Sequence, residues 1–413
     1  MTVRVPGLVL TEHELAVPLD HQRPDGEQIT VFAREVADPE SVDKPYLVFL
    51  QGGPGQEAPR PTGTPTGPGW LDRALRDYRV LMLDQRGTGR SSPIGSLPGL
   101  TPQEQADRLA HFRADSIVAD CELFRQHLGV ERWSVLGQSF GGFCALRYLS
   151  AAPQSLREVF FTGGLPPVGP PAGADIDTVY ATTFTLMRER NRRYYQRYPG
   201  DRERVRALHD LIATGEVKVP SGTMTGRWFR QVGNVLGMSD GAEQLHYLLE
   251  RDPRSPGFVW DLAAALPFKG RNPLYAVVHE ACYADGQATR WSVERVMPDD
   301  FREDPTLFTG EHVFPWNFED DADLAPLAEA ANLLAERQWP RLYDEDALRS
   351  SEVPCAAAVY HDDPYVPRQF SEETAAMIPG IRTWITNEYE HNGLRAAGGV
   401  ILDRLIGLAR GTA

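Results

Sequence analysis

Short apolar runs alternate with helical patterns along the first 165 residues. Residues 46–50 and 80–83 are almost entirely apolar, which is typical of strands buried on both faces of a parallel sheet. Residues 133–136 and 158–162 continue the series, and residues 116–125 carry apolar side chains at helical spacing. Strands that alternate with helices predict right-handed crossovers and a mostly parallel sheet with helices on both faces.

Two further β-prone runs precede this series. Residues 15–19 and 29–33 flank the turn-forming sequence Arg23-Pro24-Asp25-Gly26, a pattern that predicts a β-hairpin. Pro18 lies within the first run. Because proline has no amide donor, we expect this strand at an edge of the sheet.

The pattern changes at about residue 165. Residues 166–171 read Pro-Pro-Val-Gly-Pro-Pro, and the segment that follows is rich in helical patterns such as 184–198 and 324–336. The strand pattern resumes only at residues 354–360. An insertion this long exceeds any ordinary loop and predicts a subdomain of its own. We therefore expect one domain formed by residues 1–165 and 349–413, and a second, mainly helical domain formed by residues 166–348.

The sequence Gly137-Gln138-Ser139-Phe140-Gly141-Gly142 lies between a strand pattern and a helical pattern. Glycine tolerates strained backbone angles and lets a strand and a helix approach closely. The pattern G-x-S-x-G in this context is the nucleophile elbow of α/β-hydrolases, which raises the serine hydroxyl above the carboxyl ends of the strands. For this motif alone, a glycine- and serine-rich turn without catalytic chemistry is the alternative interpretation.

Candidates for an acid and a base follow at the ends of the last two predicted strands. The turn His361-Asp362-Asp363-Pro364 comes directly after residues 354–360, and His391 follows the predicted strand 381–385. The chain order Ser, Asp, His is the order found in α/β-hydrolases. We predict a catalytic triad of Ser139, Asp363 and His391. Asp362 is the alternative acid, and a turn aspartate that caps local amides is the interpretation without catalysis.

An oxyanion hole is predicted beside the serine. Residues 51–55 read Gln-Gly-Gly-Pro-Gly and follow a buried strand, which is the position of the loop that supplies one oxyanion-hole amide in this fold. The donors would be the backbone amides of Gly53 and Phe140. The predicted fold is thus an α/β-hydrolase fold with a large helical cap, inserted before the strand that carries Asp363, which would cover the serine and exclude water.

Composition and charge exclude several classes of partner. The formal net charge is −15, and the basic patch that nucleic-acid binding requires does not appear as a run. No stretch reaches the about 18 apolar residues of a membrane span, and we expect a soluble, cytoplasmic protein with no membrane partner. The spacing of the four cysteines fits neither a metal site nor a disulfide framework, so we expect free thiols and neither metal nor cofactor. These are Cys121, Cys144, Cys282 and Cys355.

Three motifs together resemble the proline iminopeptidases of the α/β-hydrolase fold. They are residues 51–55, residues 84–91 (DQRGTGRS) and residues 137–142 (GQSFGG). In the family the first motif usually begins with histidine, so Gln51 departs from it, but the oxyanion donor there is a backbone amide. In the second motif we expect Asp84 and Arg86 to pair and brace the loop. Residues 279–283, 309–316 and 387–393 also resemble segments of the larger bacterial members.

The resemblance implies a serine aminopeptidase that releases N-terminal proline from small peptides through an acyl-enzyme. It also implies a cap glutamate that binds the free substrate amine, with Glu280 the first choice and Glu311 the second, and Cys282 and Tyr283 as pocket walls. The alternative interpretation is that Glu280 and Glu311 both lie on exposed helical turns, as most glutamates do. Two other functions stay open: a broader aminopeptidase, amidase or esterase with the same triad, and, less favoured because all three triad residues are present, a non-catalytic binding module.

Overall fold

The computed structural model describes residues 1–413 and is built around one nine-stranded sheet with the order β1-β2-β3-β7-β4-β8-β9-β12-β13. The strands from β7 to β13 in this order run parallel, and β1, β2 and β3 are antiparallel to their neighbours. The strands are β1 (Thr2–Val5), β2 (Leu8–Pro18), β3 (Gln28–Ala37), β4 (Tyr46–Leu50), β7 (Arg79–Asp84), β8 (Trp133–Gln138), β9 (Leu156–Thr162), β12 (Cys355–Tyr360) and β13 (Ile381–Thr386).

The predicted hairpin is formed by β2 and β3, in which Pro18 lies opposite Gln28. Its first strand is not the edge of the sheet, because β1 adds outside it. However, β1 pairs only with the residues from Leu8 to Thr11. The outer side of β2 is therefore free of a strand at Pro18, where the missing amide leaves no ladder bond unmade.

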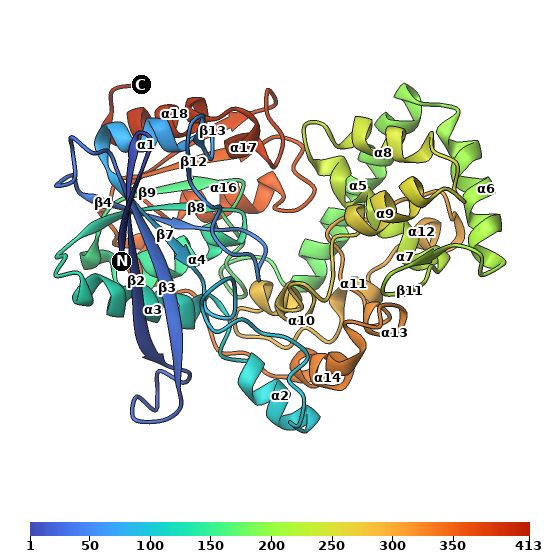
Figure 1. The fold of residues 1–413 in the computed structure, drawn as a ribbon, viewed down its shortest axis with the longest axis horizontal. Helices are drawn as coiled ribbons and strands as arrows, with labels where there is room; N and C mark the ends of the chain where they lie inside the picture. Colours follow the sequence, from blue (N-terminus) through green and yellow to red (C-terminus); the bar gives the residue numbers. More distant parts are fainter.

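Helices cover both faces of the sheet, as predicted. Val135 and Leu136 are neighbours on β8 but enter different hydrophobic cores, because side chains alternate along a strand. Helices α3 (Ala114–His127) and α4 (Phe140–Ala151) pack on the face of Val135, and α1 (Leu71–Asp77) and α18 (Gly399–Arg410) pack on the face of Leu136 (Figure 1).

The segment between β9 and β12 is mainly helical and forms a lobe beside the sheet (Figure 1). This lobe has its own core of 26 buried residues, which includes Phe184, Trp228 and Phe308. Its helices are α5 (Ile176–Arg197), α6 (Asp201–Ala213), α7 (Gly226–Phe229), α8 (Gly241–Leu249), α9 (Pro256–Ala265), α11 (Ser292–Arg295), α12 (Asp299–Glu303) and α13 (Asn317–Asp320), with the short strands β10 (Lys218–Val219) and β11 (Gly222–Thr223).

The rest of the insertion packs against the sheet domain. Helices α10 (Leu274–Val278), α14 (Ala328–Glu336) and α15 (Glu345–Arg349) contribute to the same core as α3 and α4. The remaining elements are β5 (Thr62–Gly63), β6 (Thr66–Gly67), α2 (Pro102–Leu109), α16 (Arg368–Ala376) and α17 (Gly393–Ala396), and the 3₁₀ turns η1 (Pro153–Ser155), η2 (Arg230–Gly237), η3 (Glu280–Tyr283) and η4 (Ala325–Leu327). The inserted segment therefore contributes residues both to its own hydrophobic core and to a core of the sheet domain.

The expected pair between Asp84 and Arg86 is not formed. Arg60 donates two hydrogen bonds of 2.8 Å to the carboxylate of Asp84, and Arg86 pairs with Asp120 at 2.6 Å. Both partners lie far away in the sequence, so the tertiary structure replaces the local pair. All four cysteines are buried and free, and no group of three or more His, Cys, Asp or Glu side chains is placed to hold a metal ion. None of the helices has both the length and the apolar character needed to cross a membrane.

Candidate active site

Ser139 occupies a sharp turn between β8 and α4. Its backbone φ of +53° lies in the left-handed region, which non-glycine residues adopt only where the surrounding structure enforces it. Close packing enforces it here: a Cβ added at Gly141 would lie 1.9 Å from the carbonyl oxygen of Leu50 at the end of β4. The side chain is therefore held at the carboxyl end of the sheet, with the residue 7% exposed.

A hydrogen-bonded chain runs from Ser139 to an aspartate. The Oγ atom of Ser139 lies 2.9 Å from Nε2 of His391, and Nδ1 of His391 lies 2.7 Å from Oδ2 of Asp363. The other carboxylate oxygen of Asp363 accepts the backbone N–H groups of Tyr365 and Val366 at 2.9 and 3.1 Å. These bonds fix the orientation of the carboxylate, which in turn fixes the imidazole.

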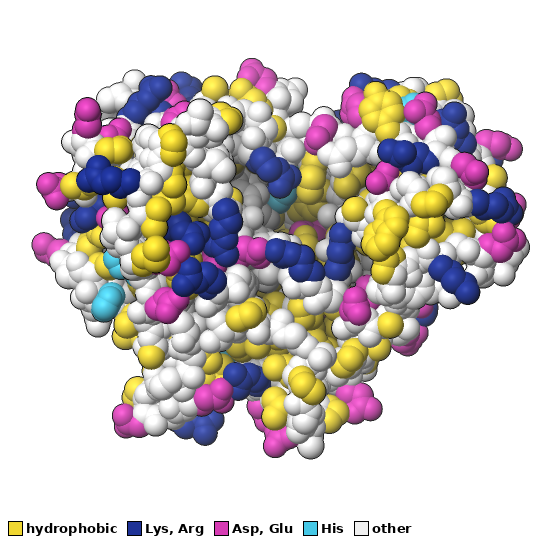
Figure 2. Space-filling model, in the orientation of Figure 1, with side chains coloured by type: hydrophobic (Ala, Val, Ile, Leu, Met, Phe, Trp, Pro, Cys, Tyr) yellow, Lys and Arg dark blue, Asp and Glu magenta, His cyan; other side chains and the backbone are white.

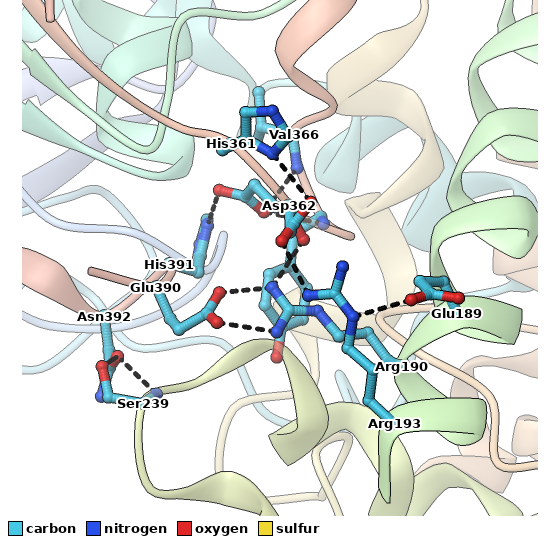
Figure 3. Close-up of polar contacts among 12 residues, drawn as sticks. Glu189, Arg190, Arg193, Ser239, His361, Asp362, Val366, Glu390, His391 and Asn392 are labelled. Carbon is cyan, nitrogen blue, oxygen red and sulfur yellow. Dashed lines mark hydrogen bonds and ion pairs between the residues drawn. The ribbon is translucent and has the colours of Figure 1, made fainter. Parts of the chain in front are cut away.

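Asp362, the alternative acid, points elsewhere. Its carboxylate lies 2.7 Å from Nη1 of Arg193 and 2.9 Å from Nδ1 of His361 (Figure 3). The structure thus brings Asp363, and not Asp362, to His391.

The electrostatics of His391 suit a proton acceptor. Burial by itself lowers the pKa of the imidazole, but the carboxylates of Asp363 and Glu311 act in the opposite direction, and the net effect is a raised pKa. Because Asp363 accepts a hydrogen bond from Nδ1–H, the lone pair of Nε2 faces the hydroxyl of Ser139. The arrangement can therefore accept the serine proton and stabilise the imidazolium that forms.

A narrow cavity opens beside Ser139. Phe140 is the first residue of α4, so its backbone N–H has no acceptor within the helix. This N–H lies at the positive end of the helix dipole. Both predicted oxyanion donors, Gly53 and Phe140, line this cavity, and so do Cys282 and Tyr283. Its other lining residues are Pro54, Ser139, Phe143, His279, Glu311 and Val366.

One buried carboxylate faces this cavity. The hydroxyl of Tyr275 donates a hydrogen bond to Oε1 of Glu311, and Nε2 of His279 lies 3.3 Å from Oε2. Burial by itself raises the pKa of Glu311, but contact with His279 and the nearby His391 and Tyr275 holds the net pKa below its usual value. Glu311 is thus a buried negative charge in the wall of this cavity.

Glu280 lies in a different, neighbouring cavity lined mainly by α10 and α14. Its Oε1 accepts the N–H of Val293 at 2.9 Å, and its Oε2 has no hydrogen-bond partner. Burial raises the pKa of Glu280 to about 7. The short η3 turn points Glu280 into this second cavity while Cys282 and Tyr283 line the first. The structure therefore brings Glu311, and not Glu280, to the cavity that holds Ser139.

Several lining residues were not singled out by the sequence. Pro54 and His279 lie inside the motifs at 51–55 and 279–283, and Phe143 follows the elbow. The sequence therefore indicated the segments that contain these residues, but not that their side chains line the cavity. Val366, which lines the cavity, and Tyr275, which donates a hydrogen bond to Glu311, carried no signal of a role there. Such residues are identified only by the packing around them.

Comparison with known proteins agrees with this architecture. A family model described as alpha/beta hydrolase fold matches residues 45–212. A proline iminopeptidase from Aeromonas sobria is 46% identical over 98% of this chain and 97% of its own length, and the proline iminopeptidase aneH from Aspergillus aculeatus is 34% identical over 98% of this chain and 94% of its own length. An alpha/beta fold family hydrolase from Bacillus anthracis superposes with a TM-score of 0.44, at 13% identity, over 98% of this chain and 99% of that chain. The identity to the two relatives extends over nearly the whole chain, and we conclude that the chain belongs to the proline iminopeptidase family, on an α/β-hydrolase fold.

Proposed function

We propose that the protein is a serine aminopeptidase that releases N-terminal proline from small peptides. The observation that carries this proposal is the joint presence, around one narrow cavity, of a serine bonded to a His–Asp pair and of the buried carboxylate of Glu311. The first group can cleave an amide, and the second can select a substrate with a free cationic terminus.

The chemistry follows from the hydrogen bonds. His391 takes the proton of Ser139 through Nε2 as Oγ attacks the carbonyl carbon of the terminal residue. Asp363 stabilises the resulting imidazolium and keeps the ring in the required tautomer. His391 then gives the proton to the leaving amine, and a water molecule activated by the same imidazole hydrolyses the acyl-enzyme.

The backbone amides of Gly53 and Phe140 are the proposed donors to the oxyanion of the tetrahedral intermediate. Both residues line the cavity that holds Ser139. Preorganised donors of this kind stabilise the charge that develops in the transition state, and loss of one typically costs about 3–4 kcal/mol. Because main-chain atoms supply these bonds, the glutamine at position 51 leaves them intact.

Glu311 is the proposed ligand of the substrate amine. Its lowered pKa keeps it ionised, and a buried carboxylate attracts the secondary ammonium group of an N-terminal proline strongly because water screens the interaction little. The apolar walls that include Phe143, Tyr283 and Val366 suit a pyrrolidine ring, and Cys282 completes this wall. Glu280 is left out of this assignment, because it lines the neighbouring cavity.

The inserted segment is the proposed cap. It contributes His279, Cys282, Tyr283 and Glu311 to the cavity, whereas Ser139 comes from the sheet domain. Figure 2 shows a deep hollow between the lobe of α5 to α9 and the sheet domain. A cap that closes over the serine limits the cavity to one terminal residue and excludes bulk water during acyl transfer.

A panel of prolyl, alanyl, leucyl and N-blocked prolyl arylamides tests this function. We expect fast release from the free prolyl amide, no release from the blocked one, and loss of all activity in Ser139→Ala. Glu311→Gln should raise KM for free-amine substrates far more than for small esters, and Glu280→Gln should do so much less. Cleavage of esters through Ser139 without cleavage of any amide would contradict the proposed substrate and favour an esterase.

A further inference from the structure

The loops that carry Asp363 and His391 are bound by the inserted segment through several hydrogen bonds. Arg190, on α5, donates from Nη1 to Oε1 of Glu390 at 2.7 Å and from Nη2 to the other carboxylate oxygen (Figure 3). The same Nη2 atom donates to the main-chain oxygen of Asp362 at 2.6 Å. One guanidinium thus contacts the residue before the acid and the residue before the base.

Other contacts from the insertion surround the histidine. The N–H of His391 donates to the carbonyl oxygen of Gly237 at 3.2 Å. The side-chain oxygen of Asn392 accepts hydrogen bonds from N and Oγ of Ser239 at 3.0 and 2.9 Å (Figure 3). The position of the base is therefore set by the insertion on both sides of the residue, and not by the sheet domain alone.

Arg190 is well suited to hold two loops at a fixed separation. The guanidinium is planar and always charged, and it forms two parallel bonds to a carboxylate with a defined geometry. The residue is 9% exposed, so water competes little for these bonds. A shift of the Asp362 carbonyl or of Glu390 moves the adjacent Asp363 or His391, because neighbouring Cα atoms are held about 3.8 Å apart.

We propose that Arg190 is a positioning residue of the Ser139 site, which ties the loop of Asp363 to the loop of His391 and thereby sets the two hydrogen bonds that activate the serine. The inference rests on the proposed role of Ser139, Asp363 and His391. Arg190 does not contact these three side chains. It acts through Glu390 and the main chain of Asp362.

The test compares Arg190→Gln with Arg188→Gln. Arg188 lies on the same helix and forms an equivalent bidentate pair with Asp300, at 2.6 and 2.8 Å, entirely within the inserted segment. It is therefore a control for the loss of one bidentate arginine–carboxylate pair on α5, and its side chain is 43% exposed where that of Arg190 is 9% exposed.

Two rates are measured: hydrolysis of a free prolyl arylamide, and covalent labelling of Ser139 by a neutral aryl phosphonate, which needs no substrate amine. For Arg190→Gln we expect kcat and the labelling rate to fall by about 10- to 100-fold, because small misplacements of reacting groups slow a reaction by this much. KM should stay nearly unchanged. Arg190→Lys should recover only part of the loss, because it cannot bridge both loops. Arg188→Gln should retain both rates.

The inference is overturned if folded Arg190→Gln keeps the wild-type kcat, if only KM changes, or if Arg188→Gln loses as much. Thermal unfolding establishes which variants are folded. If Arg190→Gln does not fold, Glu390→Gln removes the partner with less disruption and must lower both rates. If the wild type is labelled at Ser139 but releases no proline, the proposed substrate is wrong, and the labelling rates still decide the role of Arg190.

Discussion

Two buried glutamates of the same insertion have opposite electrostatic character because of their hydrogen-bond partners. Glu311 accepts a hydrogen bond from Tyr275 and lies 3.3 Å from Nε2 of His279, and these contacts, together with the nearby His391, overcome the effect of burial on its pKa. Glu280 has one backbone donor, and burial dominates. At neutral pH one side chain is an anion available to a cationic ligand, and the other is close to half protonated. The difference lies in their neighbours, since the residue type is the same.

The raised pKa of Glu280 predicts a pH dependence of stability. The folded state holds the proton up to a pKa of about 7, whereas the pKa of an unperturbed glutamate is 4.5. The stabilisation from this group is therefore complete below about pH 4.5 and is lost as the pH rises through 7. At about 1.4 kcal/mol per pKa unit the loss amounts to about 3 kcal/mol.

Glu280→Gln carries no titrating group, so its stability should decline less than that of the wild type between pH 5 and pH 8. Urea unfolding of both proteins at the two pH values measures the difference. An equal decline in both would show that Glu280 titrates normally in the folded protein.

At the scale of elements, the approach of α4 to β4 places Ser139. Gly141→Ala would add a methyl group 1.9 Å from the carbonyl oxygen of Leu50, so the helix must move away from the strand. We expect a loss of about 1–3 kcal/mol of stability and a large fall in kcat, because the turn at Ser139 moves with the helix.

Gly95 supplies the control for this substitution. No heavy atom lies within 4 Å of a Cβ added there, and Gly95→Ala should change stability by less than about 0.5 kcal/mol. Urea unfolding and arylamide hydrolysis are measured for both variants. Wild-type kcat in Gly141→Ala would refute the link between this packing contact and the geometry of Ser139.

At the scale of the whole molecule, buried contacts join the insertion to the sheet domain. Arg113, at the start of α3, donates to the carbonyl oxygens of Ala281 and Ala284 at 3.2 and 2.9 Å. Its guanidinium also lies 4.3 Å from the ring centre of Trp339. The η3 turn, which carries Cys282 and Tyr283, is thereby anchored to the domain that carries the serine.

Arg113→Met is expected to destabilise the protein by about 1–3 kcal/mol, because it removes the side-chain donor from the carbonyl oxygens of Ala281 and Ala284, and only that of Ala281 keeps a backbone donor, the N–H of Ala284. It should also raise KM for prolyl arylamides, since the cavity wall is then less well held. Urea unfolding and steady-state kinetics measure the two effects. Arg197→Met, on exposed α5 surface, removes an ion pair with Glu243 and should leave both quantities nearly unchanged. A similar KM for Arg113→Met and the wild type would argue against the anchoring role.

The sequence predicted the parts of the fold that depend on local patterns. Buried strands, the elbow at Ser139 and the long helical insertion are each visible within a short window, because side-chain periodicity and the need for glycine at a tight turn are local properties. The order of Ser139, Asp363 and His391 was also readable, since this fold places the three residues after strands of the sheet, which here are β8, β12 and β13. The mostly parallel sheet and the membership of the family agree with those predictions.

Contacts between distant segments were decided only by the tertiary structure. Asp84 pairs with Arg60 and not with the nearby Arg86, and Glu311, not Glu280, reaches the cavity of Ser139. The contacts of Arg190 with the loops of Asp363 and His391 join residues that are 172 and 200 positions apart. The physical reason is that a charged side chain takes the partner that offers the best buried geometry, and which partners are near is settled by the packing of whole elements. The sequence by itself determined the elements and the chemistry of the serine, and tertiary packing determined which side chains surround it.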